Sequence, residues 1–181
     1  MSMVYVLLGT GFEETEAIAP IDLLRRAGVE VLTVGLNGKI VYGGHGIGIE
    51  ADITEGEMDL TDLEMLVRPG GLGGVASIRG SKQAMDAIAF AYENGLYTAA
   101  ICAGPTVLGD LGITKGKHIV CYPGCEEGCP GAVFENTAAC TDGKVITGTS
   151  AGCAVSFGLA LIAALKGEEA AAAIEKQIVI R

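Results

Sequence analysis

A cysteine stands at the end of one apolar segment of this sequence, directly before Ala-Gly-Pro. Residues 98–106 read TAAICAGPT, so Cys102 lies where a strand is predicted to end and a helix to begin. The thiolate is the reactive form of cysteine, and a helix N-terminus lowers the pKa of a nearby thiol. We therefore predict that Cys102 is a nucleophile with a lowered pKa. The alternative is a buried structural cysteine, which is the more common role of a free cysteine.

Acidic residues and glycines form two further groups that could take part in chemistry. Residues 13–16 read EETE at the start of a predicted helix, and a strand is predicted to end at Pro69-Gly70-Gly71. A carboxyl group beside a thiol in a partly desolvated cleft would share a proton with it and could pass that proton to a substrate. For Glu13 and Glu14 we favour a simpler role, which is to complement the dipole of the first helical turn.

These groups would be brought together by a parallel sheet, because the chain alternates between strand and helix patterns. Strands are predicted at 4–8, 29–34, 63–67, 97–101, 118–121 and 144–147, and a small hairpin at 42–53. Helices are predicted at 13–27, 81–94, 105–111, 153–165 and 168–176. This alternation predicts a parallel sheet with helices on both faces. Ligands of such sheets bind beyond the carboxyl ends of the strands, where all three groups are expected.

Length and composition limit the classes of protein to consider. With 181 residues, half of them hydrophobic, the chain is predicted to form one domain over 1–181 with a sizeable core. The net charge of -10 argues against nucleic acid as a partner. The apolar segment Val4–Leu8 is too short for a signal peptide or a membrane span, so we expect no membrane association and a cytoplasmic location.

Six cysteines in a cytoplasmic chain are expected to be free thiols, metal ligands or catalytic groups and not disulfides. Cys121, Cys125 and Cys129 are four residues apart, but the prolines and glycines between them exclude a helix. A metal role together with His118, a redox role and no role at all stay open for this loop, whose spacing matches no common paired C-x-x-C site. Cys140 and Cys153 are expected to pack in the core.

Several segments resemble the ThiJ/PfpI superfamily, the family of the Parkinsonism-associated protein deglycase. AAICAGPTVL is similar to its nucleophile turn, GFEETEAIAPIDLLRRAG to its first loop and helix, RPGGLGG to its glycine turn, and GKVITGTSAGCAVSFGLALIAALKG to its last strand and helix. The resemblance implies a flavodoxin-like three-layer α/β sandwich with a mostly parallel central sheet, assembled as a homodimer. It also implies Cys102 as nucleophile, Glu16 as its acidic partner, and the backbone N–H groups of Gly71 and Ala103 as oxyanion donors.

The sequence departs from the family pattern at two positions. Ala103 replaces the histidine that follows the cysteine in the protease-like branch, so we do not expect peptidase activity. Tyr122 replaces a histidine found in many deglycase-like members, and a phenol is a poor base at neutral pH. His118 is predicted at the opposite end of its strand from the site. His45 lies in the predicted hairpin, which family dimers often place at the interface, and we consider it and Tyr122 as accessory residues.

Two functions are compatible with these residues. In the first, the chain is an enzyme of glyoxalase or deglycase type that needs no cofactor or metal and acts on a small reactive carbonyl such as methylglyoxal, with Cys102 as nucleophile. In the second, it is a redox-sensing or chaperone-like protein of oxidative stress, in which Cys102 is oxidised without turnover. The missing histidine favours the second function, and the presence of Cys102 and Glu16 is compatible with both.

Overall fold

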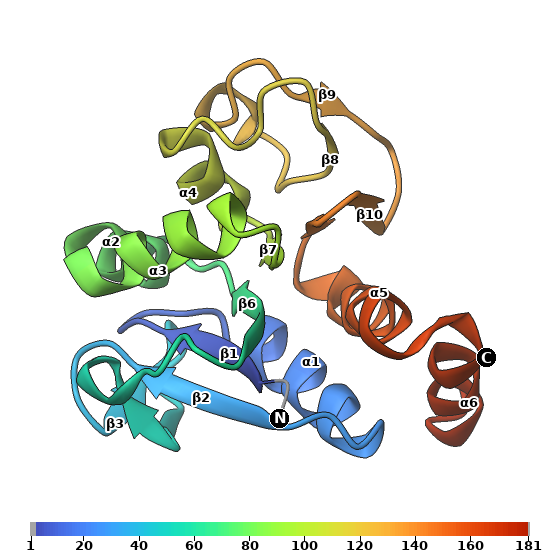
Figure 1. Cartoon of the computed structure of the whole chain (residues 1–181), viewed down its shortest axis with the longest axis horizontal. Helices are drawn as coiled ribbons and strands as arrows, with labels where there is room; N and C mark the ends of the chain where they lie inside the picture. Colours follow the sequence, from blue (N-terminus) through green and yellow to red (C-terminus); the bar gives the residue numbers. More distant parts are fainter. Residues whose placement is uncertain (1–2, 181) are drawn as a thin grey trace.

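The fold is an α/β sandwich around a mostly parallel sheet, as predicted. The computed structural model describes residues 3–180, so residues 1, 2 and 181 of the predicted domain lie outside it. Within this range one sheet contains seven strands in the order β10-β11-β7-β6-β1-β2-β5, of which only β10 runs antiparallel to its neighbour (Figure 1). The strands are β1 Met3–Leu8, β2 Val31–Gly35, β5 Ile53–Thr54, β6 Leu63–Arg68, β7 Tyr97–Ile101, β10 Ala139–Asp142 and β11 Val145–Gly148.

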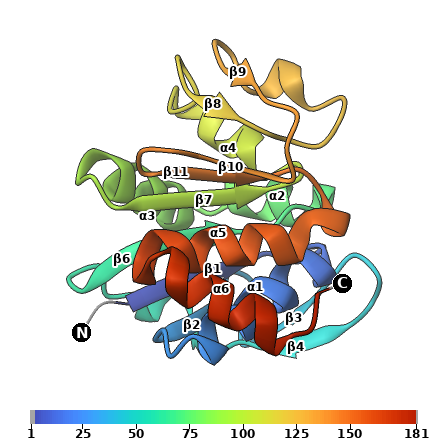
Figure 2. The ribbon, with the colours of Figure 1, turned by 90° about the vertical axis from the view of Figure 1, so that its right-hand side faces the viewer.

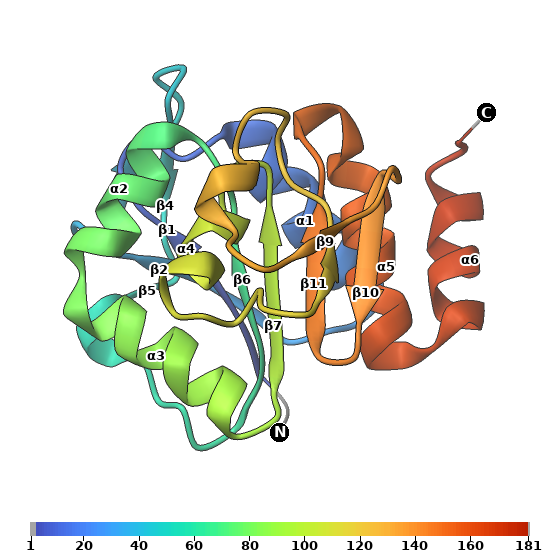
Figure 3. The same cartoon turned by 90° about the horizontal axis from the view of Figure 1, so that it is seen from above.

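Helices cover both faces of the sheet and form the two outer layers. On one face lie α1 (Glu14–Arg26) and α5 (Ala154–Lys166), with α6 (Glu168–Gln177) packed on the outer side of α5 (Figures 2 and 3). The opposite face carries α2 (Leu72–Gly80), α3 (Lys82–Glu93) and α4 (Pro105–Asp110). Side chains of β1 alternate between the two cores: Val4, Val6 and Leu8 contact the first, and Tyr5 and Leu7 the second.

Three parts of the chain differ from the prediction. The glycine-rich stretch after Gly71 was expected to be only a turn, but it begins helix α2, where Gly74 packs so closely that a Cβ would lie 2.7 Å from Phe12 Cα. The predicted strand 118–121 does not join the central sheet: β8 (His118–Ile119) pairs with β9 (Val133–Phe134) in a small sheet above α4 (Figure 1). Strand β10 was not predicted.

The predicted hairpin is present but shorter. It consists of β3 (Ile40–Tyr42) and β4 (Gly48–Glu50), while β5 joins the edge of the central sheet next to β2. Single 3₁₀ turns occupy Glu55–Glu57, Glu126–Gly128 and Ala151–Cys153. None of the helices in residues 3–180 is both long enough and apolar enough to cross a membrane.

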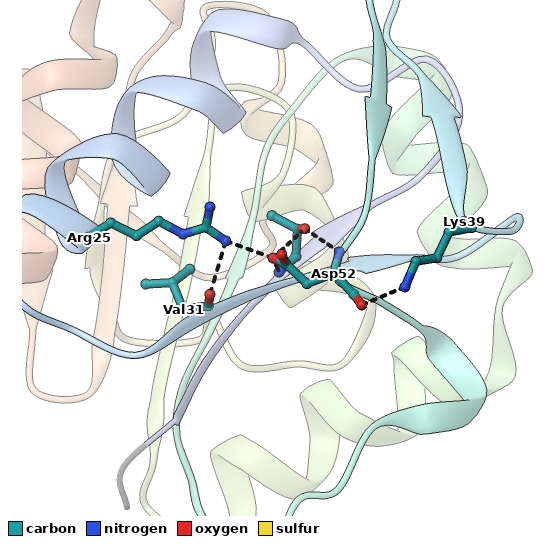
Figure 4. Close-up of polar contacts among 5 residues, drawn as sticks. Arg25, Val31, Lys39 and Asp52 are labelled. Atoms are coloured by element: carbon teal, nitrogen blue, oxygen red, sulfur yellow. Dashed lines mark hydrogen bonds and ion pairs between the residues drawn. The ribbon is translucent and has the colours of Figure 1, made fainter.

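Asp52 connects the hairpin to the helix and strand beside it (Figure 4). Its Oδ2 accepts hydrogen bonds from the backbone N–H and hydroxyl of Thr33, both at 2.8 Å, and from Arg25 Nη2 at 2.7 Å. The same Arg25 nitrogen donates to the carbonyl oxygen of Val31 at 3.1 Å, and Lys39 Nζ donates to the carbonyl oxygen of Asp52 at 2.6 Å. Asp52 therefore fixes the base of the segment that carries His45.

Candidate active site

Cys102 occupies a sharp turn between β7 and α4. Its backbone φ is 65°, in the left-handed region that few residues other than glycine adopt. The turn is held from both sides, since the Cys102 N–H donates to the carbonyl oxygen of Gly148 at 2.9 Å and its carbonyl oxygen accepts from the Tyr122 N–H at 2.8 Å. Such strain persists only where surrounding contacts hold it, and it is common at functional sites. The strand-end position predicted for this half-buried thiol is therefore present in the structure.

Glu16 approaches the thiol from the first turn of α1. The helix begins after Glu13, whose Oε2 accepts the N–H of Glu16 at 2.7 Å and so caps it. Glu16 is 1% exposed, and its Oε2 accepts the N–H of Gly70 at 2.8 Å. Its other oxygen, Oε1, is buried without a hydrogen bond of standard geometry among the described residues, and the side chain that interacts with this carboxyl group is Cys102.

The glycines after β6 allow these two side chains to meet. A Cβ at Gly70 would lie 2.6 Å from Glu16 Oε2 and 2.7 Å from Cys102 Cβ, so a side chain there would separate them. Gly71 has a φ of 82°, and a Cβ there would lie 2.5 Å from the carbonyl oxygen of Gly11. The backbone N–H groups of Gly71 and Ala103 both form hydrogen bonds with the Cys102 thiol. The four residues implied by the family resemblance thus lie together.

The thiol and the carboxyl group influence each other's ionisation. Burial raises the pKa of the Glu16 carboxyl group, although hydrogen bonds with Cys102 and Gly70 oppose this effect. Burial, followed by the hydrogen bond and charge of Glu16, raises the pKa of the Cys102 thiol to about 12, although the N–H groups of Ala103 and Gly71 act in the opposite direction. The lowered pKa expected from the strand-end position is therefore not found for a thiol beside an ionised Glu16.

The value of about 12 belongs to the loss of the last proton of the pair, because a charged Glu16 contributes to it. Between the raised first pKa and this last one, Glu16 and Cys102 together carry one proton and one negative charge. That proton can reside on either group. The N–H that reaches the sulfur at the start of α4 is that of Ala103, two residues before the first residue of the helix.

His45 does not contact Cys102 but is bound to Glu14. Its Nδ1 lies 2.8 Å from Glu14 Oε2, and its N–H donates to Glu14 Oε1 at 2.7 Å. Burial opposes ionisation of Glu14, but the ring and backbone of His45 lower the pKa of this carboxyl group overall. In return, the hydrogen bond that its ring donates to Glu14 raises the pKa of His45, whose side chain is 75% exposed. Glu14 therefore holds the hairpin in addition to beginning α1.

The ligand atoms of Glu13, Glu14 and His45 lie within 4.8 Å of one another, close enough for one metal ion. All three already have other hydrogen-bond partners: Glu13 caps α1, and Glu14 and His45 bind each other. Acidic groups of this kind are common without an ion, and the arrangement is explained by the contacts that it makes within the chain.

Tyr122 and His118 are placed differently. Tyr122 contacts the site through its backbone N–H, which donates to the carbonyl oxygen of Cys102. Tyr122 is 49% exposed. His118 lies at the start of β8, where its Nδ1 is 2.6 Å from Glu135 Oε1. No contact between His118 and the four site residues occurs in the described part of the chain, as expected from its position in the sequence.

Arg68 is a residue near the site that the sequence reasoning missed. It is the last residue of β6, directly before the Pro69-Gly70-Gly71 turn, and it is fully buried. Its three guanidinium nitrogens have no hydrogen-bond partner among the described residues, and burial lowers the pKa of Arg68 to about 9. The only signal in the sequence is one charged residue at the end of an apolar strand, which usually indicates a strand leaving the core.

Comparisons with known proteins agree with this geometry. The family model described as the DJ-1/PfpI family matches residues 2–164. The chain is 32% identical over 178 residues to "Protein dj-1beta" of Drosophila melanogaster, covering 97% of this chain and 95% of that protein. It is 29% identical over 124 residues to a protein of Pyrococcus abyssi named a deglycase, covering 68% of this chain and 74% of that protein.

A solved structure supports the same relationship. The structure of Toxoplasma gondii DJ-1, described as oxidized, superimposes with a TM-score of 0.92 and 30% sequence identity over 98% of both chains. The similarity therefore covers the sheet, both helix layers and the segments that carry the candidate site.

Proposed function

This chain belongs to the DJ-1/PfpI family, and from that premise we propose that it is a cysteine-dependent enzyme acting on small reactive carbonyls. The observation that carries the proposal is the meeting of Cys102, Glu16 and two backbone N–H groups around Gly70. The deglycase name of the Pyrococcus abyssi relative points to the same class of substrate. No peptidase activity is proposed, because Ala103 replaces the histidine of a Cys-His pair.

The shared proton supplies the nucleophile. Two N–H groups, from Gly71 and Ala103, stabilise a negative charge on the sulfur, whereas one N–H, from Gly70, stabilises a charge on Glu16. Hydrogen-bond donors that face a charged group favour its ionisation. Because two N–H groups face the sulfur and one faces the carboxyl group, they favour a Cys102 thiolate beside a protonated Glu16. A proton on Oε1 would also give this buried oxygen a partner, the sulfur. In this state the thiolate exists at neutral pH even though burial opposes it.

The reaction that fits this arrangement converts an α-oxoaldehyde and water into a hydroxy acid. The Cys102 sulfur adds to the aldehyde carbon, and the N–H groups of Gly71 and Ala103 pass from the sulfur to the new oxyanion. Glu16 first gives its proton to this oxyanion and becomes a carboxylate. The carboxylate then takes the proton from the former aldehyde carbon and returns it to the neighbouring carbon, while the hydroxyl proton passes to the oxygen of that neighbouring carbon, so that the adduct becomes a thioester. Water cleaves the C–S bond, which releases the hydroxy acid and restores the thiol. For methylglyoxal the product is lactate.

We also propose that the chain forms a homodimer through the face that contains α1, α5 and the hairpin. Ile18 on α1 is 46% exposed, Val155 on α5 is 36% exposed, and Ile47 beside β4 is 58% exposed. Helices α1 and α5 pack side by side, so Ile18 and Val155 belong to neighbouring elements. Covering such side chains with a second copy would remove apolar surface from water.

A second function, redox sensing without turnover, is supported by the buried Oε1 of Glu16. A protonated Oε1 could donate to an oxygen atom added to the Cys102 sulfur and so stabilise a sulfenate or sulfinate. The related Toxoplasma gondii structure is described as oxidized. The tyrosine at position 122, where a base would assist turnover, favours this function as well.

The deciding experiment measures lactate released from methylglyoxal by the wild type, Cys102→Ala and Cys140→Ala. Cys140 is half-buried on β10 and donates its S–H to the carbonyl oxygen of His118, outside the site, so it is a matched control. We expect turnover in the wild type and in Cys140→Ala and none in Cys102→Ala. If the wild type releases no lactate but gains oxygen on Cys102 under peroxide, the sensing function replaces the enzymatic one.

A further inference from the structure

Three cysteines are in the segment that joins β8 to β9, and the proposed reaction uses none of them. Cys129 is 1% exposed and Cys121 is 7% exposed, while Cys125 is half-buried; all three are free thiols. The thiols of Cys121 and Cys129 each affect the pKa of the other, so the two sulfurs lie close enough to interact. Two thiols that lie close together are the arrangement from which a disulfide forms.

Successive turns bring the ends of this segment together. The N–H of Cys125 donates to the carbonyl oxygen of Tyr122 at 2.9 Å, and the N–H of Cys129 donates to that of Glu126, also at 2.9 Å. The N–H of Gly128 donates to the carbonyl oxygen of Cys125 at 3.0 Å. These turns keep the chain compact between Cys121 and Cys129, so the two residues stay close although seven residues separate them.

The segment is also packed tightly against α4. A Cβ at Gly109 would lie 1.9 Å from the carbonyl oxygen of Gly128, and a Cβ at Gly128 would lie 2.6 Å from Thr106 Cγ2. Cys129 belongs to the same core as Val107 and Leu108 of α4. Close packing of this kind holds Cys129 in place, which favours a disulfide because disulfide geometry is narrow.

Metal binding by the three thiols is a weaker explanation. Within residues 3–180, the group of three or more ligand atoms that lie within 4.8 Å of one another is that of Glu13, Glu14 and His45, and it contains no sulfur. The three sulfurs would have to move before they could share one ion, whereas Cys121 and Cys129 are already neighbours.

We propose that Cys121 and Cys129 form an intramolecular disulfide when the protein meets a hydroperoxide. One thiolate attacks the terminal peroxide oxygen, so that the O–O bond breaks and a sulfenic acid and an alcohol form. The second thiol attacks the sulfenic sulfur, the S–S bond forms and water leaves. In total, the two thiols lose two protons and two electrons, and the hydroperoxide is reduced to an alcohol and water.

Burial of both thiols makes the reaction slow at neutral pH. It raises the pKa of Cys129 to about 11 and that of Cys121 to about 12. Either thiol can attack the hydroperoxide, and the other then resolves the sulfenic acid. Because the thiolate is a small fraction at neutral pH, the disulfide should form slowly and faster as the pH rises.

The site of modification adjoins the nucleophile without being part of it. Tyr122, which follows Cys121, donates its N–H to the carbonyl oxygen of Cys102. A disulfide would therefore fix the loop that holds the turn at Cys102. The proposal does not depend on the carbonyl chemistry of Cys102.

The test uses full-length Cys102→Ser protein, which removes the other reactive thiol. The protein is treated with tert-butyl hydroperoxide at pH 7 and pH 9, and free thiols are blocked with N-ethylmaleimide. Trypsin gives the peptide 118–144, and a protease that cuts after glutamate then cleaves at Glu126 and Glu127, between Cys125 and Cys129, and at Glu135. We expect two thiols to be lost, faster at pH 9, and the fragment with Cys121 to stay joined to the fragment with Cys129 until dithiothreitol is added.

Single substitutions assign the linked pair. Cys125→Ser, in the same Cys102→Ser background, should keep the joined fragments, whereas Cys121→Ser and Cys129→Ser should abolish them. The proposal would be overturned if the fragments separated without reductant. It would also be overturned if Cys125 were one of the two linked residues in the protein that retains it. The Cys102→Ser protein without a further substitution shows whether a disulfide forms, even if one of the single variants fails to fold.

Discussion

The carboxyl group of Glu16 and the thiol of Cys102 meet beside Gly70. A Cβ at Gly70 would lie 2.6 Å from Glu16 Oε2 and 2.7 Å from Cys102 Cβ. The backbone N–H of Gly70 binds the carboxyl group, and that of Gly71 binds the thiol. The two groups therefore share one proton, and neither can be titrated or replaced without changing the other.

Alkylation of Cys102 by iodoacetamide should begin at a lower pH than that of an ordinary thiol. With the shared proton on Glu16, the thiolate forms as the pair loses its first proton, whose pKa lies above the ordinary glutamate value of 4.5. The rate, followed by peptide mapping, should reach a plateau before Cys125 and Cys140 react. A midpoint for Cys102 at or above about 8.5 would show that the proton stays on the sulfur.

Glu16→Gln should lower methylglyoxal turnover at least about tenfold, because general acid-base groups typically contribute about 100-fold or more. The amide keeps the shape of the side chain but cannot release a proton. Glu93→Gln, at the end of α3, is the matched control and should change nothing. The double variant Glu16→Gln/Cys102→Ala should be no slower than Cys102→Ala alone. Unchanged turnover, alkylation and peroxide sensitivity in Glu16→Gln would reduce Glu16 to a first-turn acid.

Asp52→Asn should destabilise the fold at neutral pH but not in acid. Burial raises the pKa of Asp52, but hydrogen bonds from Thr33 and the charge of Arg25 lower it overall from 3.8. Because the folded-state pKa is below the unfolded one, the stabilisation is present above about pH 4 and disappears as the pH falls through the folded value. Urea unfolding should show a loss of roughly 1 kcal/mol at pH 7, less if solvent screens this part-exposed group.

The corresponding control is Asp22→Asn, which removes an exposed i,i+4 pair with Arg26 and should change the free energy of unfolding by less than about 0.5 kcal/mol. A difference between wild type and Asp52→Asn that is as large at pH 3 as at pH 7 would contradict an ionic role for Asp52.

Arg68→Met should raise the free energy of unfolding by about 1 to 3 kcal/mol. The guanidinium group is fully buried and has no hydrogen-bond partner among the described residues, so an apolar side chain of similar length removes a desolvated charge. Thermal and urea unfolding measure the change. Arg79→Met, which removes an exposed pair with Asp110, should be neutral or slightly destabilising. A less stable Arg68→Met would mean that ordered water or an anion holds the guanidinium group.

Sedimentation equilibrium at micromolar concentration should give twice the chain mass, and Ile18→Asp should shift the protein toward the monomer. The reason is that the substitution places a charge in the proposed contact between two copies of α1 and α5. Phe90→Ser on α3, which is 38% exposed on the opposite face, is the control and should leave the dimer intact. A monomer in the wild type would refute the assembly.

Much of the fold could be predicted because its elements carry their own local signals. The apolar runs that became β1, β6 and β7 and the amphipathic pattern of α1 needed no distant information. Helix α2 was missed because its glycines disfavour a helix locally, and only close packing on residues 9–12 explains them. Strand β8 was misplaced because two residues with strand propensity do not reveal which neighbour they pair with.

One residue of the candidate site could also be predicted from a local signal. Cys102 is marked by its strand-end position, whereas Glu16 was selected from EETE only through the family resemblance. The hydrogen bond from Gly70 and the buried state of Arg68 depend on how distant segments pack, so no pattern in the sequence could show them. The pKa of Cys102 was predicted from the helix that follows it, but burial and the charge of Glu16 outweigh that helix.

The positive φ at Cys102 bears on how this chain can change during evolution. Glycine adopts a φ of 65° without penalty, whereas any other residue pays about 1 kcal/mol or more there. A lineage that no longer needs the thiol would gain stability from glycine at position 102 and nothing from serine or alanine. Glycine at this position in a related chain would therefore mark a descendant that kept the fold after abandoning its sulfur chemistry.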